Sequence, residues 1–442
     1  MNPEKITDQL FDFIDNSPTA FHAVANAAKM LSVAGYEKIE RECEANVVPG
    51  GKYYLTRNDS SIIAFRLPGG KPAGFRIAAS HSDSPCFKVK EKPEMVVEGH
   101  YRRLNTEGYG GMIMSTWMDR PLSVAGRVMV KTDAGIETRL VNLDRDLCII
   151  PNVAIHFNRE INKGYSYNPQ VDLIPLFSGV TEKKDGEKAA GEDKSEADTL
   201  KSLCARELGV DADQILASDL YLYCRDKGRR MGANNEFIGS PRLDDLQCAF
   251  GTLAGFLKAE EECGAGKYAA IYAVFDNEEI GSGTKQGADS TFLADVIDLI
   301  CESLELSGKE RRDILAGSFL LSADNAHAVH PNHPEKSDPT NRPYVNGGIV
   351  LKFQGSQKYT TDGYSAAVIC DICARKNVPC QTFANRSDVA GGSTLGNISS
   401  AHVSIPAADI GLPQFAMHSA IETAGVLDTG YLVELCEEYY KG

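Results

Sequence analysis

Tyr268-Ala-Ala-Ile-Tyr-Ala-Val-Phe275 is an apolar run that leads directly into Asp276-Asn-Glu-Glu279 and then Gly281-Ser-Gly283. An apolar run of this length between turn residues predicts a strand buried on both of its faces. The two adjacent glutamates at its end repel each other, and such pairs persist where a cation binds one acid and the other holds a proton. A solvated acidic loop is the alternative, and the rest of the chain decides between the two.

The composition is that of an ordinary globular protein. The chain has 442 residues, of which 43% are hydrophobic and 24% charged, and this length favours two domains over one. A net charge of −15 argues against nucleic acid and against anionic membrane surfaces as partners. We see neither a secretory signal nor an apolar stretch near the roughly 18 residues that span a bilayer. These features predict a cytoplasmic protein with no nucleic-acid or membrane partner.

Twelve cysteines are scattered along the chain without a regular framework. Several lie inside apolar patterns, which is typical of reduced, buried thiols in a cytosolic protein: Cys224, Cys248, Cys301 and Cys436. The pair Cys370-Asp-Ile-Cys373 has the spacing of a redox pair or of half a zinc site. Its surroundings are helical in pattern and no second close pair completes a four-thiolate site, so we interpret both as core cysteines.

The pattern of apolar and polar residues changes twice along the chain. From about residue 92 to 233, short alternating runs such as 122–130 and 136–142 indicate half-buried antiparallel strands. Within this region, residues 181–195 are charged and nearly devoid of large apolar side chains, which predicts a solvated or disordered loop. On both sides of the region the pattern is α/β, so we expect an α/β domain interrupted by a β-rich inserted domain.

The expected elements of the α/β part follow from periodicity and capping signals. We expect helices at 4–15, 19–34, 244–261, 289–306, 363–376 and 427–440. We expect strands at 74–79, 268–275, 318–322 and 348–353.

Candidate metal ligands cluster at the carboxyl ends of the expected strands, where open α/β sheets place their sites. Asp244 is the exception, because it lies at the start of an expected helix. The full set of candidates is His81, Asp83, Asp244, Glu278, Glu279, Asp324 and His418. Each has a structural alternative as a helix cap, a core histidine or a turn former. Their coincidence at strand ends and at one helix start favours a metal site over these separate explanations.

The ligand types indicate the metal and the reaction. Two histidines with three carboxylates suit zinc, cobalt or manganese. One catalytic zinc needs three protein ligands, whereas five ligands and a spare acid suit two ions that share a carboxylate and a bridging water. The spare glutamate can then move a proton from the water to a leaving amine, so we expect peptide-bond hydrolysis. In a competing cluster, His327-Ala-Val-His330-Pro-Asn-His333, the prolines break any helix, and only His327 stays a functional candidate.

With these residues assembled, the chain closely resembles the aspartyl aminopeptidase family, which also includes vacuolar aminopeptidase I. The resemblance covers nearly the whole chain and rests on four motifs in order: His-Ser-Asp-Ser-Pro at 81–85, Ser-Pro-Arg-Leu-Asp at 240–244, Asp-Asn-Glu-Glu-Ile-Gly-Ser at 276–282, and Ser-Ala-Asp-Asn-Ala-His-Ala-Val-His-Pro-Asn at 322–332. It implies a mixed-sheet catalytic α/β domain of the zinc-peptidase type at 1–91 and 234–442. It also implies a β-rich inserted domain at 92–233 that mediates dimerisation, within a hollow tetrahedral dodecamer.

The resemblance implies a role for each candidate. Two divalent ions per subunit, most often zinc with cobalt or manganese as alternatives, would be held by His81 and Asp324, by Glu279 and His418, and by Asp244 as the bridge. Glu278 would be the general base and acid, and Asp83 would orient His81. Substrate contacts fall on His327, Lys352, Tyr359 and, across a subunit interface, His156. Asp245 departs from the asparagine often found after the bridging aspartate, which makes the coordination there less secure.

The sequence therefore predicts an aminopeptidase that removes the N-terminal residue from peptides. Lys352 favours an acidic residue at that position if it points into the first subsite. Two alternatives stay open: a related metal-dependent dipeptidase or deacylase, and an assembly scaffold that has lost catalysis.

Overall fold

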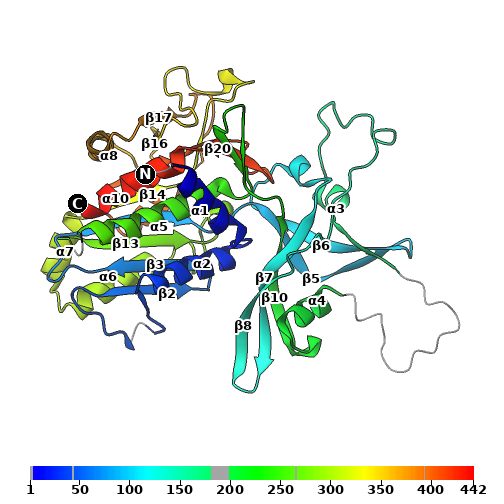
Figure 1. Cartoon of the computed structure of the whole chain (residues 1–442), viewed down its shortest axis with the longest axis horizontal. Coiled ribbons are helices and arrows are strands. Elements are labelled where there is room, and N and C mark those ends of the chain that lie inside the picture. The colour runs from blue at the N-terminus through cyan, green and yellow to red at the C-terminus, as the bar shows by residue number, and fades with distance from the viewer. Residues whose placement is uncertain (1–2, 42–43, 181–198, 264–265, 393) are drawn as a thin grey trace. The chain divides into compact units, whose positions relative to one another are not determined.

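The computed structural model describes residues 3–41, 44–180, 199–263, 266–392 and 394–442 (Figure 1). The loop predicted at 181–195 lies outside these residues. The chain divides into two compact units: unit 1 comprises residues 1–84, 227–417 and 422–442, and unit 2 comprises residues 85–226 and 418–421. The sequence placed the corresponding boundaries at 91/92 and 233/234. A dimerising role for the inserted part stays a prediction.

A nine-stranded mixed sheet runs through unit 1 (Figure 1). Its strands, in spatial order, are β1 (Glu37–Lys38), β2 (Lys52–Arg57), β3 (Ser61–Arg66), β13 (Ala269–Phe275), β4 (Phe75–His81), β14 (Phe319–Ala323), β18 (Ala407–Gly411), β16 (Ile349–Phe353) and β17 (Cys380–Ala384). The central strands β13, β4, β14 and β18 are parallel to their neighbours in this group. Every residue of β13 is buried, which confirms the two-sided burial predicted for this strand.

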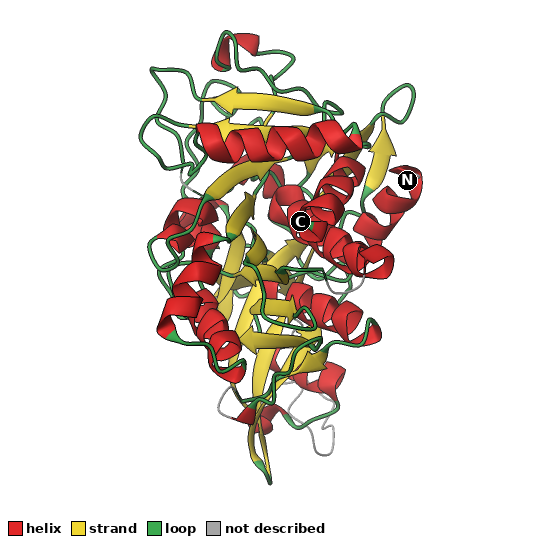
Figure 2. Ribbon diagram, turned by 90° about the vertical axis from the view of Figure 1, so that its left-hand side faces the viewer, coloured by secondary structure: helices red, strands yellow, loops and turns green. Residues whose placement is uncertain are grey.

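Helices cover both faces of this sheet (Figure 2). Successive side chains of a strand point to opposite faces, so each strand contributes to an apolar cluster on either side. Tyr272 of β13 belongs to one apolar cluster, and its neighbour Ile271 belongs to the other. The first cluster includes residues of α1 (Pro3–Asp15), α2 (Ala20–Val33), α5 (Leu243–Cys263), α8 (Gly363–Lys376) and α10 (Asp428–Lys441). The second includes residues of α6 (Phe292–Ser303), α7 (Gly308–Ala316) and α9 (Leu395–Ser400). The predicted helices are confirmed to within a few residues at their ends.

The structure corrects the interpretation of one of the two cysteines on α8 that the sequence assigned to the core. Cys373 is buried, with 2% of its surface exposed, which confirms that interpretation for one of them. Cys370 is exposed, so the interpretation is wrong for the other, because its position on α8 faces away from the apolar cluster that takes up Cys373.

Unit 1 also contains a second, smaller sheet of five strands. It joins β11 (Arg229–Met231), β12 (Phe237–Ser240), β20 (Glu422–Gly425), β19 (Pro413–Phe415) and β15 (Ala326–His327), in this order. β15 begins two residues after Asp324, so a candidate ligand comes just before this strand of the smaller sheet.

Unit 2 contains a six-stranded antiparallel sheet, as the alternating sequence pattern predicted. The order is β8 (Gly135–Asn142), β7 (Leu122–Thr132), β10 (Ile215–Cys224), β5 (Cys86–Val97), β6 (Tyr101–Tyr109) and β9 (Leu176–Gly179), with helices α3 (Pro169–Asp172) and α4 (Leu200–Leu208). Its core includes Trp117, whose ring meets Phe87 edge-on at 5.3 Å. Among the helices described in either unit, none is long and apolar enough to cross a membrane.

Candidate metal centre

Three strand ends bring the candidate ligands of unit 1 to one edge of the large sheet. β4, β13 and β14 are parallel, so their carboxyl ends meet at the same edge. His81 is the last residue of β4 and pairs with Phe275, the last residue of β13. Glu278 and Glu279 follow β13 in a short 3₁₀ turn (Glu278–Ile280), and Asp324 directly follows β14.

The start of α5 supplies two further carboxylates. Asp244 and Asp245 are both buried and have non-helical backbone angles, and the peptide bond between them is cis. The amide nitrogen of Asp244 donates to Oε2 of Glu422 at 2.9 Å, and Oγ of Ser84 donates to the carbonyl oxygen of Asp244 at 2.7 Å. These two contacts fix the backbone of Asp244 relative to β20 and to the segment that follows β4.

The imidazole of His81 lies at the centre of the cluster. Its Nε2 is 3.5 Å from Oδ1 of Asp244, 3.9 Å from Oδ1 of Asp324 and 4.0 Å from Oδ2 of Asp245. The ligand atoms of these four residues all lie within 4.8 Å of one another, and those of His81, Glu278 and Glu279 form a second such group. A buried set of one imidazole and several carboxylates is the donor set that suits zinc, cobalt or manganese.

Asp83 connects the two halves of this cluster. Nδ1 of His81 lies 3.1 Å from the carbonyl oxygen of Asp83 and 3.3 Å from its Oδ1. The carboxylate of Asp83 also accepts from the amide nitrogens of Glu278 and Glu279, at 3.1 and 3.2 Å. A proton on Nδ1 leaves Nε2 as the basic nitrogen, so these contacts direct Nε2 toward the acids.

The crowded carboxylates shift one another's proton affinity. Burial raises the pKa of Glu278 to about 7; the neighbouring His81 opposes this increase, and the carboxylates of Asp324, Asp83 and Asp244 add to it. Burial and the neighbouring carboxylates, Asp244 first among them, raise the pKa of Glu279 well above its ordinary value. Burial alone would lower the pKa of His81, but the surrounding acids raise it well above its ordinary value. A bound cation relieves this repulsion, so the donor set fits a metal.

Lys352 is buried beside the cluster, with 3% of its surface exposed. Its Nζ lies 3.2 Å from Oδ2 of Asp324 and 5.6 Å from the centre of the Tyr359 ring. Burial alone would lower the pKa of Lys352, but the carboxylate of Asp324 and other groups raise it above its ordinary value. The ammonium group is therefore charged, and the structure pairs it with a candidate ligand.

A cavity of about 340 Å³ in unit 1 contains two of the predicted substrate contacts, His327 and Tyr359, together with Phe383. Its ionisable lining is mostly basic: His327, His330, Lys336 and Arg386 stand against Asp338. Hydrogen bonds from the amides of Asn341 and Thr340 lower the pKa of Asp338 to about 2, so this acid is ionised. The cavity thus suits a small polar or anionic group.

Two predicted site residues belong to unit 2. His418 is half-buried, has a backbone φ of 68°, and its Nδ1 lies 3.1 Å from the carbonyl oxygen of Gly111. His156 is exposed in the stretch between β8 and α3. Their roles as a metal ligand and as a substrate contact from a neighbouring subunit stay predictions.

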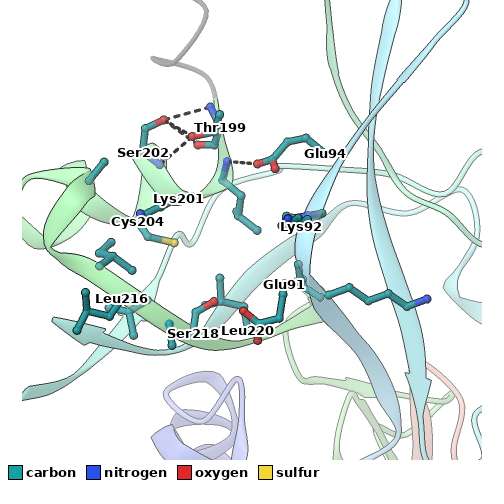
Figure 3. A pocket seen from close by; sticks show the side chains of 18 of the residues that line it. Glu91, Lys92, Glu94, Thr199, Lys201, Ser202, Cys204, Leu216, Ser218 and Leu220 are labelled. Carbon is teal, nitrogen blue, oxygen red and sulfur yellow. Dashed lines mark hydrogen bonds between the residues drawn. The ribbon is translucent and has the colours of Figure 1, made fainter. Parts of the chain in front are cut away.

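Unit 2 also has a cavity, of about 460 Å³, between β5, α4 and β10 (Figure 3). Polar groups on its rim serve to cap α4: Thr199 and Ser202 bond each other reciprocally, and the amide of Leu200 donates to Oε1 of Glu94 at 2.8 Å. None of the predicted site residues lines this cavity. It therefore contributes nothing to the candidate metal centre.

Sequence reasoning missed two acids at the site. Asp245 was noted only as a departure from the family pattern, yet it is fully buried and its Oδ2 accepts from the amide of His81 at 3.1 Å. Glu422 was not singled out, although it positions Asp244. An acid flanked by small and apolar residues in Ala420-Ile-Glu-Thr-Ala424 is the signal that could have found Glu422.

Comparison with known proteins agrees with this geometry. A family model described as aminopeptidase I zinc metalloprotease (M18) matches residues 13–440. A probable M18 family aminopeptidase 2 of Clostridium acetobutylicum is 45% identical over 447 residues, which cover 100% of this chain and 99% of that protein. The structure of the Ape4 and Nbr1 complex has a chain that matches with a TM-score of 0.93 at 35% identity, over 99% of this chain and 86% of that one. The mApe1 dodecamer of S. cerevisiae matches with a TM-score of 0.86 at 26% identity, over 100% of this chain and 97% of that one. The chain therefore belongs to the M18 aminopeptidase family of zinc metalloproteases, which confirms both the predicted fold class and the predicted enzyme class, a metal-dependent aminopeptidase.

Proposed function

We propose that the chain removes N-terminal residues from peptides at a site for two divalent ions, zinc first, with cobalt or manganese as alternatives. The observation that carries this proposal is the convergence of buried acids around His81 at the carboxyl edge of β4, β13 and β14. The proposed ligands are His81 and Asp324 for one ion, Glu279 and His418 for the other, and Asp244 for both. Bound ions supply polarisation of the peptide carbonyl and a lower pKa for water.

Glu278 is the proposed proton carrier. It lies next to Glu279 in the same 3₁₀ turn, its amide donates to Asp83, and its carboxylate belongs to the same close group as His81 and Glu279. As a base it takes a proton from the attacking water, and as an acid it delivers that proton to the leaving amine nitrogen. In this proposal Glu279 holds a cation and Glu278 moves the proton.

The basic cavity is the proposed place of the substrate's first side chain. His327 and Tyr359 line it, and the ammonium group of Lys352 lies near the Tyr359 ring and is held by Asp324. Among the charged groups of the lining, Lys336 and Arg386 outnumber Asp338, and this excess of positive charge favours an acidic N-terminal residue. Peptides that begin with aspartate or glutamate are therefore the proposed preferred substrates.

We also propose assembly in the cytoplasm into a homo-oligomer, a dodecamer as in the S. cerevisiae mApe1 structure. In such an assembly His156 would contact substrate bound to a neighbouring subunit. Its exposure, and that of Phe157 beside it at 87%, support a role at an interface.

A Glu278→Gln variant tests the mechanism, since glutamine keeps the shape of the side chain and removes its basicity. We expect kcat on an aminoacyl reporter to fall by about 10²–10⁴-fold, with metal content and oligomeric state unchanged. Glu302→Gln, an exposed glutamate on α6, is the matched control and should retain full activity. Unchanged turnover in Glu278→Gln would disprove the assigned role.

A panel of substrates separates the alternative functions. The zinc-loaded wild-type chain should cleave tripeptides and longer peptides from the amino end. Activity restricted to dipeptides or N-acyl amino acids would indicate a dipeptidase or deacylase. A folded, metal-loaded oligomer without hydrolysis would indicate a scaffold.

A further inference from the structure

The side chain of Asn325 joins the two chain segments that carry the proposed ligands Asp324 and Asp244. Asn325 directly follows Asp324 and is buried, with 2% of its surface exposed. Its Nδ2 donates to the carbonyl oxygen of Leu243 at 3.0 Å, and Leu243 directly precedes Asp244. One hydrogen bond therefore connects the residue after one ligand to the residue before the other.

This connection bridges two different elements of unit 1. Asp324 follows the carboxyl end of β14, whereas Asp244 lies at the start of α5. The backbone angles of Asp244 and Asp245 are not helical, so the regular hydrogen bonds of a helix do not fix the position of Asp244. Contacts from side chains outside α5 have to supply that constraint.

The amide group of Asn325 has a partner for each of its polar atoms. Besides Leu243, its Nδ2 lies 2.9 Å from Oε1 of Gln414 and 3.2 Å from Oε1 of Gln247. Its Oδ1 accepts from Sγ of Cys248 at 3.2 Å. Asn325, Gln247, Cys248 and Gln414 are all buried. Since Nδ2 faces three acceptors and Oδ1 faces a donor, these contacts define a single orientation of the amide.

The same contacts lead on to Glu422, which holds Asp244 from its other side. Nε2 of Gln414 lies 3.5 Å from Oε1 of Glu422, and Oε2 of Glu422 accepts from the amide nitrogen of Asp244 at 2.9 Å. The backbone around Asp244 is thus held at two successive peptide groups, by Asn325 at one and by Glu422 at the next. Asn325 is the member of this group that also adjoins Asp324.

The spacing that results is close to the one that an ion requires. Two ligand atoms about 2.1 Å from a tetrahedral zinc ion are roughly 3.4 Å apart. Nε2 of His81 lies 3.5 Å from Oδ1 of Asp244 and 3.9 Å from Oδ1 of Asp324. The three groups therefore need only small shifts to reach one ion, although two of them are acids that repel each other.

We propose that Asn325 is a positioning residue that sets the spacing of Asp244 and Asp324 for a shared metal ion. This inference rests on the ligand set of the proposed function. Asn325 acts through the two carboxylates, because its own amide is occupied by Leu243, Gln414, Gln247 and Cys248. Without the amide, repulsion between the acids separates the end of β14 from the start of α5, and binding of the ion has to reverse this separation.

Zinc affinity of the full-length protein tests the proposal. The protein is stripped of metal and titrated with zinc in competition with a chromophoric chelator. Asn325→Leu is similar in size and lacks the amide, and we expect its zinc affinity to be about 10–100-fold lower than that of the wild type. Asn325→Ser, which leaves room for water, is the second variant in case the leucine does not fold, and it should lose affinity in the same range. Wild-type affinity in folded Asn325→Ser would overturn the proposal.

Ser318→Ala is the matched control at the opposite end of the same strand. Ser318 directly precedes β14 and is buried, and its Oγ donates to the carbonyl oxygen of Ile314 at 2.7 Å and accepts from the amide of Phe75 at 2.8 Å. Its loss should lower the Tm and leave the zinc affinity unchanged. If Ser318→Ala weakens zinc binding as much as Asn325→Ser does, the effect is a general loss of stability and the proposal is wrong.

The visible absorption spectrum of the cobalt-loaded protein reports the ligand geometry directly. At saturating cobalt, we expect the spectrum of Asn325→Ser to differ from that of the wild type, and that of Ser318→Ala to match it. An Asn325→Ser spectrum identical to that of the wild type would contradict a change in ligand spacing.

Asp324→Asn separates this inference from the proposed function on which it rests. If Asp324→Asn lowers the zinc affinity and Asn325→Ser does not, the role of Asn325 is disproved and the ligand set stands. If neither variant lowers the zinc affinity, the ligand set is wrong, and the role of Asn325 falls with it.

Discussion

The metal cluster and the neighbouring cavity of unit 1 have opposite charge and opposite exposure. The cluster gathers several carboxylates around His81, and most of these groups are buried. The cavity gathers exposed basic side chains such as Lys336. Asp324, Lys352 and Tyr359 connect the two regions through successive contacts. The difference indicates two separate roles. Buried carboxylates need a bound cation to offset their repulsion, whereas exposed basic side chains attract an anion directly.

Removal of one cluster charge should have the largest effect. Asp244→Asn keeps the size of the side chain but removes the charge of the proposed shared ligand from the buried group. We expect less than full metal content by elemental analysis and a fall in kcat/KM of at least about 10³-fold, equivalent to ~4 kcal/mol of transition-state stabilisation. Asp313→Asn, at an exposed position on α7, should change neither quantity. Normal metal content with normal kcat/KM would show that the cluster is not the catalytic region.

Loss of an orienting contact should have an intermediate effect. Asp83→Asn removes the carboxylate that meets Nδ1 of His81 and the amides of Glu278 and Glu279. We expect metal affinity, measured by competition with a chelator, to fall by about 10–100-fold. Activity at saturating metal should recover much more than affinity does. An unchanged affinity would mean that Asp83 has no part in orienting His81.

The elements that position the cluster were predictable because their signals are local. The apolar run at 268–275 became β13 (Ala269–Phe275), and the helix expected at 363–376 is α8 (Gly363–Lys376). A ligand at the end of each parallel strand follows from the general rule for open sheets, so His81 and Asp324 were accessible from pattern alone.

Contacts between distant segments were not predictable in the same way. Nothing in the sequence around Lys352 shows that its ammonium group pairs with Asp324, because the direction of a side chain depends on the register of β16 beside β18. Glu422 was likewise overlooked, since its contact with the amide of Asp244 joins β20 to the start of α5 and follows no spacing motif. Both cases depend on tertiary packing, which local periodicity does not encode.

The smallest effect is expected in the cavity, where the groups are exposed and solvent screens their charge. Lys336→Gln removes a cation from the lining, whereas Arg386 already pairs with Asp388 at 2.8 Å and is a weaker test. We expect the ratio of kcat/KM for glutamyl over leucyl reporters to fall by about 2–5-fold, equivalent to ~0.4–1 kcal/mol, chiefly through KM. Lys309→Gln, an exposed cation on α7, is the control and should leave the ratio unchanged. If Lys336→Gln changes kcat/KM for both reporters equally, the cavity does not select an acidic side chain. The difference in charge between the cluster and the cavity would then have no role in substrate selection.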